Sequence, residues 1–412
     1  MSSKMFSEHS DPIPLSGGHA KATDTVGMQE MFNRYARHMP QTSEDVPPTC
    51  GRKTIAIIGS TGFLGPYIVA SLLRVHTESE IFCLNRSADG KQRTISALHD
   101  ITDDMSAALP RLQFLVTDIT QPSFGLDAVQ IALIVSEVDE LVFNAWDPNW
   151  SKPLEYFEPF LKAVRSTVDL CASAPRQPRI TFVSSICAVG NLPLAHAAQP
   201  RVPEEVISNN HCAMPHGYGE SKCVAEQLLA KAHEVSGLRI NIVRAGQIGG
   251  PSRSRARTWP RQGWVYSILK ASKKLQCFPT HVQPLDWIPV DSFADGIANS
   301  TKTSPELETL QVFNMVHPEP ASWHVLYDTL SSRFGLSMQT TSLSDWLDRL
   351  DTRDLKLHSF LRAMGNGREY NMPFSNERAL RVLPPVVPIN EDLLAEWLMG
   401  WKLGPGDFKA KM

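Results

Sequence analysis

Tyr218 and Lys222 stand four residues apart in the segment YGESK, which opens a stretch of helical periodicity. Residues at this spacing share one face of a helix, so the two side chains would be neighbours. An ammonium group beside a phenol favours the phenolate and lowers the phenol pKa from its usual value of about 10. We therefore predict that Tyr218 acts as an acid or base near neutral pH, with Lys222 as its partner.

A hydroxyl group is expected beside this pair. Ser184 and Ser185 end the segment RITFVSS, which has the apolar pattern of a buried strand over residues 179–185. A hydroxyl at the end of such a strand can hydrogen-bond a substrate oxygen next to Tyr218. Helical Tyr/Lys pairs are usually structural, but a strand-end serine and a glycine turn upstream favour a catalytic interpretation here.

The glycine turn covers residues 59–65, with the sequence GSTGFLG, after a predicted strand and before a predicted helix. A dinucleotide fingerprint requires this context. Gly59 permits the tight turn, Gly62 lets backbone amides approach a pyrophosphate, and Gly65 lets the helix pack closely on the strand. A glycine-rich turn without a ligand is the alternative. The predicted cofactor-binding residues of the turn are Gly59, Ser60, Thr61, Gly62, Phe63, Leu64 and Gly65.

The second predicted strand ends in Asn85-Arg86-Ser87, where an NAD-preferring site would carry an acid for the ribose 2′-hydroxyl. An arginine suits a 2′-phosphate, so we predict NADPH as the cofactor and Arg86 as the residue that selects it. A solvated surface arginine is the alternative.

Two later strand ends give weaker signals for the same nucleotide. Asp118 and Ile119 follow the third predicted strand and would flank the adenine ring. Asn144 follows the fourth strand and would line the route of the pyrophosphate and ribose. A plain loop role is an equal alternative for each.

Short apolar strands alternate with helix-length segments from Thr54 onward, which is typical of a doubly wound parallel sheet. After about residue 262 the pattern becomes irregular and more helical. The predicted fold class is α/β, a Rossmann-like doubly wound parallel sheet with a smaller, mostly helical C-terminal substrate subdomain. The predicted strands cover residues 54–59, 81–85, 111–116, 140–144, 179–185 and 239–245.

Three regions are predicted along the chain. Residues 1–50 would form a flexible leader to about residue 26, a short docking helix over 27–38 and a linker. Residues 51–262 would form an NADP-binding Rossmann domain, and residues 263–412 a substrate-binding subdomain with returns to the sheet.

Composition excludes several classes of function. The 412 residues carry a formal net charge of −3, which gives no electrostatic reason to expect nucleic acid or an anionic membrane as a partner. No apolar run approaches the length of a membrane span or a secretory signal, so a cytoplasmic enzyme is expected. The 7 cysteines form no CxxC pair, which favours reduced thiols, and no metal site is predicted.

Together these motifs resemble the extended short-chain dehydrogenase/reductase superfamily. Ser185 (counted back from Gly190), Tyr218 and Lys222 match its catalytic positions. Further segments are similar to the thioester reductases that terminate non-ribosomal peptide and polyketide synthases, α-aminoadipate reductases and carboxylic acid reductases. These segments are STGFLG, VRAGQIGG at 243–250, PLDWIPVD at 284–291, VFNMVHPEPASW at 312–323 and INEDLLAEWL near the end.

The resemblance implies hydride transfer from NADPH to an acyl thioester on the phosphopantetheine arm of an acyl carrier protein. Ser185 and Tyr218 would hold the carbonyl oxygen, Tyr218 would donate its proton, and Lys222 would hold the nicotinamide ribose. The product would be an aldehyde, with an alcohol after a second round. Since the three predicted regions leave no room for an adenylation or carrier domain, the acyl substrate of such a reductase would be delivered in trans. The oligomeric state is left open.

The sequence departs from the usual family pattern in two places. Trp146-Asp147-Pro148 stand where relatives more often have small or polar residues, so we expect a narrowed or aromatic acyl pocket. The segment after Gly250 is rich in arginine and is a candidate to dock an acidic carrier or clamp the phosphate of its arm, with a solvated loop as the alternative. These arginines are Arg253, Arg255, Arg257 and Arg261.

Two other functions remain open. The same residues could serve a free-standing extended dehydrogenase or epimerase that acts on a ketone, an alcohol or a nucleotide sugar. A redox-silent cyclase or nucleotide sensor is the third alternative, although such relatives typically lack the tyrosine.

Replacing Arg86 with alanine should weaken NADPH binding by about 1–3 kcal/mol, because a charge-assisted contact to the 2′-phosphate would be lost. NADH has no 2′-phosphate, so its affinity should change little. Dissociation constants for both nucleotides test the prediction. An equal loss for NADPH and NADH would show that Arg86 does not contact the 2′-phosphate.

Overall fold

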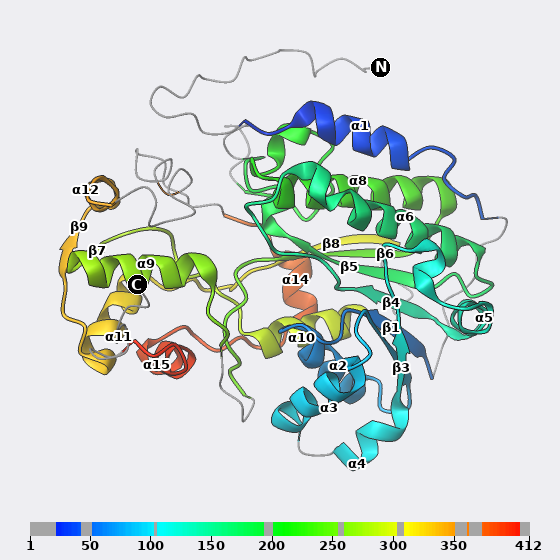
Figure 1. Cartoon of the computed structure of the whole chain (residues 1–412), viewed down its shortest axis with the longest axis horizontal. Helices are drawn as coiled ribbons and strands as arrows, with labels where there is room; N and C mark the ends of the chain where they lie inside the picture. The colour runs from blue at the N-terminus through cyan, green and yellow to red at the C-terminus, as the bar shows by residue number, and fades with distance from the viewer. Residues whose placement is uncertain are drawn as a thin grey trace.

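The computed structural model describes residues 22–42, 52–102, 105–192, 201–253, 259–302, 309–350, 361 and 373–403. At its centre is a seven-stranded sheet in the order β3-β2-β1-β4-β5-β6-β8, with every neighbouring pair parallel (Figure 1). The order reverses between β1 and β4, and open α/β sheets bind ligands at such a switch point. The strands are β1 (Thr54–Ile58), β2 (Glu80–Asn85), β3 (Leu112–Val116), β4 (Glu140–Phe143), β5 (Arg179–Ser185), β6 (Ile240–Ala245) and β8 (Leu310–Met315).

Helices cover both faces of the sheet, because alternate residues of each strand point to opposite sides. In β1, Ala56 and Ile58 belong to one apolar core, whereas Ile55 and Ile57 belong to the other. The predicted six strands and the α/β fold class are confirmed, and β8 is a seventh strand that was not predicted as one. The first face carries α1 (Thr25–Tyr35), α5 (Ala128–Glu137), α6 (Glu158–Ser173) and α8 (Gly217–Ser236); the second carries α2 (Gly65–Val75), α3 (Gly90–Ile101) and α10 (Val290–Ser300).

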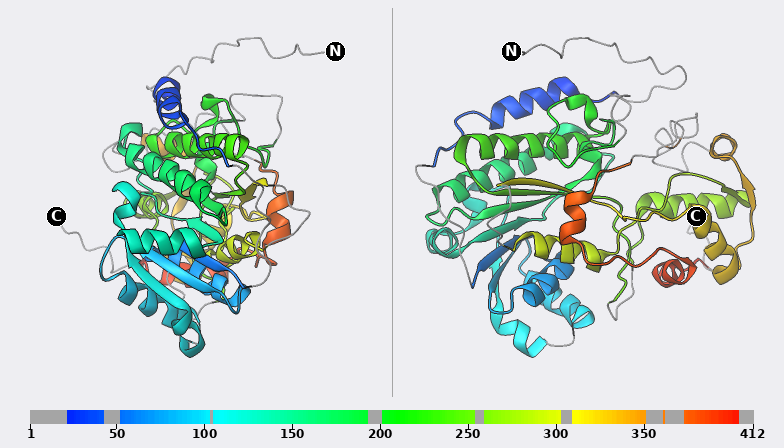
Figure 2. Two further views of the ribbon diagram at one scale, coloured as in Figure 1. Left: turned by 90° about the vertical axis from the view of Figure 1, so that its right-hand side faces the viewer. Right: turned by 180° about the vertical axis from the view of Figure 1, so that it is seen from behind.

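A separate apolar core lies beside the sheet and is rich in tryptophan. The most buried rings, none more than 1% exposed, include Trp259, Trp287, Trp323, Trp346, Trp397 and Trp401. Five of them donate their indole N–H to backbone carbonyls at 2.7–3.1 Å, so burial leaves these five donors satisfied. Figure 2 shows the surrounding elements grouped at one side of the sheet: α9 (Gly263–Leu275), β7 (Cys277–Pro279), α11 (His324–Phe334), β9 (Gln339–Thr341), α12 (Leu343–Asp348) and α15 (Glu391–Met399).

Other C-terminal elements return to the sheet. Besides β8 and α10, the short helix α14 (Glu377–Val382) packs through Ala379 into the core on the second face of the sheet. Of the helices in the described ranges, none combines the length and apolar character needed to cross a membrane.

Helix α1 begins two residues earlier than predicted and is fastened at both ends. Asp24 caps it by accepting a hydrogen bond from Gly27 N at 2.9 Å, and its own N–H donates to Glu220 Oε1 at 2.9 Å. At the other end, Arg165 of α6 donates to the carbonyl oxygens of Tyr35, Arg37 and His38. The predicted flexible leader is therefore wrong over residues 22–26, while residues 1–21 lie outside the described ranges.

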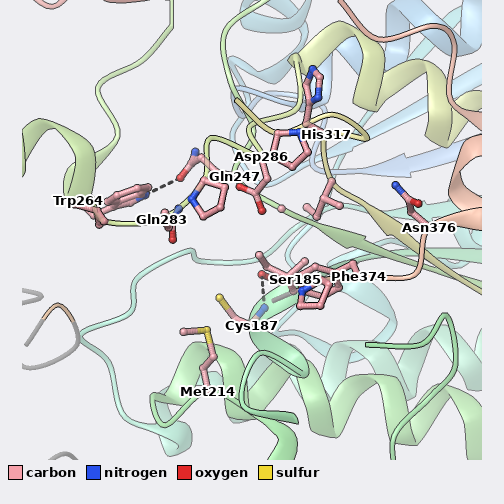
Figure 3. Close-up of a pocket in the computed structure, with 18 of the residues that line it drawn as sticks. Ser185, Cys187, Met214, Gln247, Trp264, Gln283, Asp286, His317, Phe374 and Asn376 are labelled. Atoms are coloured by element: carbon pink, nitrogen blue, oxygen red, sulfur yellow. Dashed lines mark hydrogen bonds between the residues drawn. The ribbon is translucent and has the colours of Figure 1, made fainter. Parts of the chain in front are cut away.

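A cavity of about 310 Å³ lies between the carboxyl edge of the sheet and the C-terminal elements (Figure 3). Its walls combine residues that follow β5 and β6 with residues from the loops after β7 and β8. The carboxyl edge of the sheet thus borders a partly open cavity of ligand size at the ends of β5, β6 and β8.

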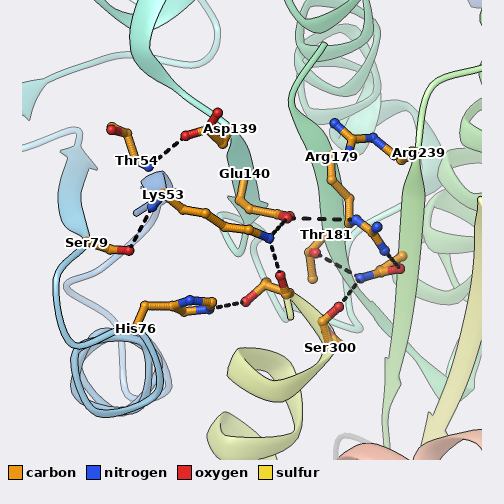
Figure 4. A network of polar contacts seen from close by, with 12 residues as sticks. Lys53, Thr54, His76, Ser79, Asp139, Glu140, Arg179, Thr181, Arg239 and Ser300 are labelled. Carbon is orange, nitrogen blue, oxygen red and sulfur yellow. Dashed lines mark hydrogen bonds and ion pairs between the residues drawn. The ribbon is translucent and has the colours of Figure 1, made fainter. Parts of the chain in front are cut away.

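The opposite, amino-terminal edge of the sheet is closed by a buried charge network (Figure 4). Lys53, Glu140 and Arg179 stand at the starts of β1, β4 and β5, and each is at most 5% exposed. Lys53 Nζ donates to Glu140 Oε1 at 2.8 Å and to Thr301 O at 2.7 Å, and Arg179 Nε lies 3.9 Å from the same carboxylate. Burial raises the pKa of Glu140, and both cations oppose that rise. The network thus fixes three strand starts on the side away from the cavity.

Replacing Lys53 with alanine should lower the free energy of unfolding by about 3–5 kcal/mol, because it leaves the Glu140 carboxylate buried beside a more distant cation only. Arg52→Ala is the matched control. It breaks an exposed pair with Glu80 and should cost at most about 1 kcal/mol. Chemical unfolding of both variants checks the prediction, and an equally small loss for Lys53→Ala would contradict it.

Candidate active site

The glycine turn leaves β1 in a conformation that needs glycine at two places. Gly59 has φ +93°, and a Cβ there would lie 3.1 Å from Ala145 N. A Cβ at Gly65 would collide with the carbonyl oxygen of Gly59 and with the backbone of Ser60. In contrast, a Cβ at Gly62 would meet no atom within 4 Å, so open space lies in front of the turn.

Two asparagines tether this turn. Asn85 Oδ1 accepts from Ser60 N at 3.0 Å, and Asn144 Nδ2 donates to Gly59 O at 2.9 Å. Asn144 was predicted to line the nucleotide route, whereas sequence reasoning did not single out Asn85, although it precedes Arg86. A rigid turn with open space before the N-terminus of α2 fits a pyrophosphate.

The other residues predicted to contact the nucleotide lie at the carboxyl ends of adjacent strands. Arg86 is exposed directly after β2, and Asp118 is half-buried after β3. Hydrogen bonds from the side chain and backbone of Thr120 lower the pKa of Asp118, and attraction by Arg86 lowers it further. Ile119 packs against the apolar core of the first face. The structure thus brings Arg86 and Asp118 together at the edge that carries the turn.

Tyr218 lies in the first turn of α8, where it meets the end of β5. The Ser185 hydroxyl hydrogen-bonds Tyr218 and accepts from Cys187 N at 3.2 Å. Burial raises the pKa of Tyr218 strongly, Cys187 adds to the rise, and the Ser185 hydrogen bond opposes it. This direction is opposite to the one predicted from the Tyr/Lys spacing, so Tyr218 is a protonated phenol at neutral pH.

The position of Lys222 explains that difference. Its Nζ donates to Val183 O at 2.7 Å and lies 4.0 Å from the ring centre of Trp146, compared with 5.9 Å from the ring centre of Tyr218. Burial lowers the pKa of Lys222 well below its usual value, although Glu226 opposes the shift. The ammonium that was expected to lower the pKa of Tyr218 is therefore itself disfavoured.

Ser184 points to the opposite side of β5 from Ser185. Its hydroxyl donates to Glu226 Oε1 at 2.5 Å. Arg244 of β6 also binds Glu226, with Nε 3.1 Å from both carboxylate oxygens and Nη2 2.8 Å from Oε2. Sequence reasoning missed Glu226, which is one helical turn beyond Lys222, and Arg244, which is part of the VRAGQIGG segment. Their spacing in the chain gave no sign that they pair.

The cavity carries a hydroxyl and a thiol group on one wall and an amide and a carboxylate group on the opposite wall (Figure 3). Ser185 and Cys187 line it on the β5 side. Gln247 and Asp286 line it on the other. Large apolar side chains complete the lining, among them Trp150, Met214, Trp264 and Phe374.

Trp146 does not narrow this cavity, contrary to the sequence-based expectation. It packs behind Lys222, stacked on Phe157 with ring centres 6.5 Å apart and edge-on to Phe182 at 5.6 Å. The residues that line the cavity include Trp150 of the same segment and not Trp146. An aromatic residue of this segment therefore does line the cavity, but it is Trp150, four positions after Trp146.

Of the arginines after Gly250, Arg253 and Arg261 belong to the described residues, and they bind different partners. Arg253 binds Asp295 at 2.6 Å, with Asp291 3.5 Å away, and Arg261 donates to Trp401 O at 2.9 Å. Both side chains are thus engaged within the chain. Arg255 and Arg257 lie outside the described residues.

Comparison with known proteins identifies the family. Residues 57–297 match the NAD-binding family model described as male sterility protein. The chain belongs to this family. A nicotinamide cofactor is consistent with that membership and with the geometry of the glycine turn.

Individual relatives are similar over most of the chain. The carboxylic acid reductase of Neurospora crassa is 30% identical over 346 residues, which cover 82% of this chain and 32% of that protein. The crystal structure of the terminal R domain from the myxalamid PKS-NRPS biosynthetic pathway has a TM-score of 0.77, with 24% identity, covering 91% of this chain and 97% of that one. A thiolation-reductase di-domain from an archaeal non-ribosomal peptide synthetase has a TM-score of 0.67 at 17% identity, covering 91% and 80%.

These comparisons confirm the resemblance drawn from the motifs. The two solved structures share the fold, and the carboxylic acid reductase shares the sequence pattern. The chain spans about a third of the length of that reductase.

Proposed function

We propose that this protein is an NADPH-dependent reductase of an acyl thioester held on the phosphopantetheine arm of a carrier protein. The observation that carries the proposal is the position of the Ser185 hydroxyl, which lines the cavity and lies beside Tyr218 at the end of β5. The tethered glycine turn lies at the same edge of the sheet, so a nucleotide and an acyl group could meet there. The names of the relatives, which include a carboxylic acid reductase and the R domain of a synthase, support the thioester as substrate.

The residues present fit NADPH. The turn around Gly62 would hold the pyrophosphate, Arg86 the 2′-phosphate, and Asp118 with Ile119 the adenine end. Asn144 supports the turn, and Tyr218 and Lys222 would hold the nicotinamide ribose. When bound, NADPH supplies a hydride.

The thioester carbonyl takes up a hydride at carbon and a proton at oxygen, and its C–S bond then breaks to give an aldehyde and a thiol. Ser185 and Tyr218 would donate hydrogen bonds to the carbonyl oxygen, which becomes negative as the carbon is reduced. Tyr218 would then transfer its phenolic proton to that oxygen. Since burial keeps Tyr218 protonated, the site is prepared for the reductive direction.

Lys222 would contribute mainly a fixed hydrogen-bond donor, because burial disfavours its charged ammonium form. Its amine is fixed by the Val183 carbonyl and by the face of Trp146, with Phe182 4.5 Å away. From there it can donate a hydrogen bond to a ribose hydroxyl. An arriving polar ligand that favours the ammonium would strengthen both that bond and the proton donation by Tyr218.

Tyr218→Phe should lower turnover of an acyl-pantetheine thioester by at least about 100-fold, because the proton donor is lost, while NADPH binding remains. Ser185→Ala should cost roughly 10²–10³-fold, the value of one oxyanion donor. NADPH oxidation at saturating substrate provides the readout.

The matched control is Ser184→Ala, which removes a hydroxyl bonded to Glu226 and should reduce stability while most of the turnover remains. Equal losses for Ser184→Ala and Ser185→Ala would contradict the assignment of Ser185. Wild-type protein that reduces ketones but no thioester would instead support the free-standing dehydrogenase.

A further inference from the structure

Asp286 places a carboxylate in the cavity for which the proposed mechanism has no use. It lines the wall across from Ser185, and Figure 3 shows its carboxylate directed into the space. Within the described ranges its own backbone N–H is the donor that reaches it, and it forms no ion pair there. Asp286 is half-buried, and burial raises the pKa of its carboxyl group to about 6.

The backbone holds this carboxylate firmly. Leu285 exchanges two hydrogen bonds with Ala321, at 2.8 and 3.0 Å, and Ile288 N donates to Gln247 O at 3.0 Å. Between these anchors Asp286 O accepts from His317 N at 3.0 Å. Fixing the segment in this way means that the carboxylate is positioned before any ligand arrives.

The segment before Trp287 supplies part of the cavity wall. Gln283, Pro284 and Asp286 line the cavity, whereas Leu285 and Trp287 are fully buried in the tryptophan-rich core. Among the described residues that line the cavity, Asp286 is the one acidic side chain. Its neighbours across the space include the apolar rings of Trp264 and Phe374.

Charge indicates which end of the substrate meets Asp286. Arg201 also lines the cavity but is exposed, so it stands at the opening, where the phosphate of an arm would enter. A carboxylate would repel that phosphate, and Asp286 lies on the wall that faces Ser185. The acyl group beyond the reacting carbonyl is the part of the substrate that would reach it.

We propose that Asp286 is a specificity-determining residue that accepts a hydrogen bond from a hydroxyl or amino group on the acyl chain. This inference rests on the proposed function. The site would then favour acyl groups that carry a donor over plain alkyl or aryl groups, because an apolar acyl group would cover the half-buried carboxylate without giving it a hydrogen bond.

The test compares benzoyl-pantetheine with its 2-, 3- and 4-hydroxy and amino derivatives, and butyryl- with 3-hydroxybutyryl-pantetheine. We expect wild-type protein to prefer at least one donor-bearing substrate by kcat/KM. Asp286→Leu should reduce that preference by about tenfold to a hundredfold, the value of a charge-assisted hydrogen bond, and should leave the unsubstituted substrate equal or better. Asp286→Asn keeps the shape of the side chain and one neutral acceptor. Its preference for donor-bearing substrates should therefore lie between those of wild-type protein and Asp286→Leu.

Asn376→Leu is the matched control, since it removes a polar group from the same cavity without removing a charge, and the preference should persist. Acyl-N-acetylcysteamine substrates separate the acyl group from the arm. The inference would be overturned if the preference of wild-type protein for donor-bearing acyl groups changed when pantetheine was replaced by the shorter N-acetylcysteamine. So would a wild-type protein with no preference for a donor, or Asp286→Leu with an unchanged preference.

Calorimetry with unreactive amide analogues of the same acyl-pantetheines gives an independent readout. If wild-type protein reduces no thioester, the proposed function fails, yet these dissociation constants still test Asp286. Loss of the hydroxyl preference in Asp286→Leu would support its role in binding, and an unchanged preference would contradict it.

Discussion

The buried ion pair between Arg244 and Glu226 sets the geometry on which the candidate site depends. Both residues are at most 2% exposed, and removing either partner would leave an uncompensated charge in the interior. The pair joins α8 to β6, and Ser184 extends it to β5. Arg244 also donates to Asn314 Oδ1 of β8 at 3.3 Å and to two loop carbonyls, so it joins three strands and one helix. Tyr218 and Lys222 are held over the end of β5 by this arrangement.

Burial then determines the chemistry that these side chains can perform. Because Ser184 faces Glu226, strand alternation turns Ser185 toward Tyr218 and the cavity. The same enclosure raises the pKa of Tyr218 and lowers that of Lys222, so both side chains favour their neutral forms. A protonated phenol next to a second hydroxyl can stabilise and then protonate an oxygen that becomes negative. The proposed reduction of a carbonyl uses the protonated phenol, whereas oxidation of an alcohol would need the phenolate.

Local patterns in the sequence predicted the sheet and the glycine turn because both follow from neighbouring residues. Apolar runs predicted six strands, but β8 was missed since it lies among irregular segments and pairs with β6 far earlier in the chain. The Tyr/Lys spacing placed both residues on α8, yet burial decides the direction of both pKa shifts. The rings that lie beside Lys222 come from other segments, Phe182 from β5 and Trp146 from the loop after β4. Asp286 reaches the cavity through contacts with distant segments, and no local pattern encodes such contacts.

Transfer of a hydride to an acyl thioester is the central claim, and isotope labelling tests it most directly. The protein would be incubated with NADPH carrying deuterium at the transferable position and with an acyl-pantetheine, and the products measured by mass spectrometry. The account predicts an aldehyde with one deuterium, or an alcohol with two after a second round, together with an equal amount of free pantetheine thiol. Unlabelled acid with free thiol, or an intact thioester while a ketone is reduced, would contradict it.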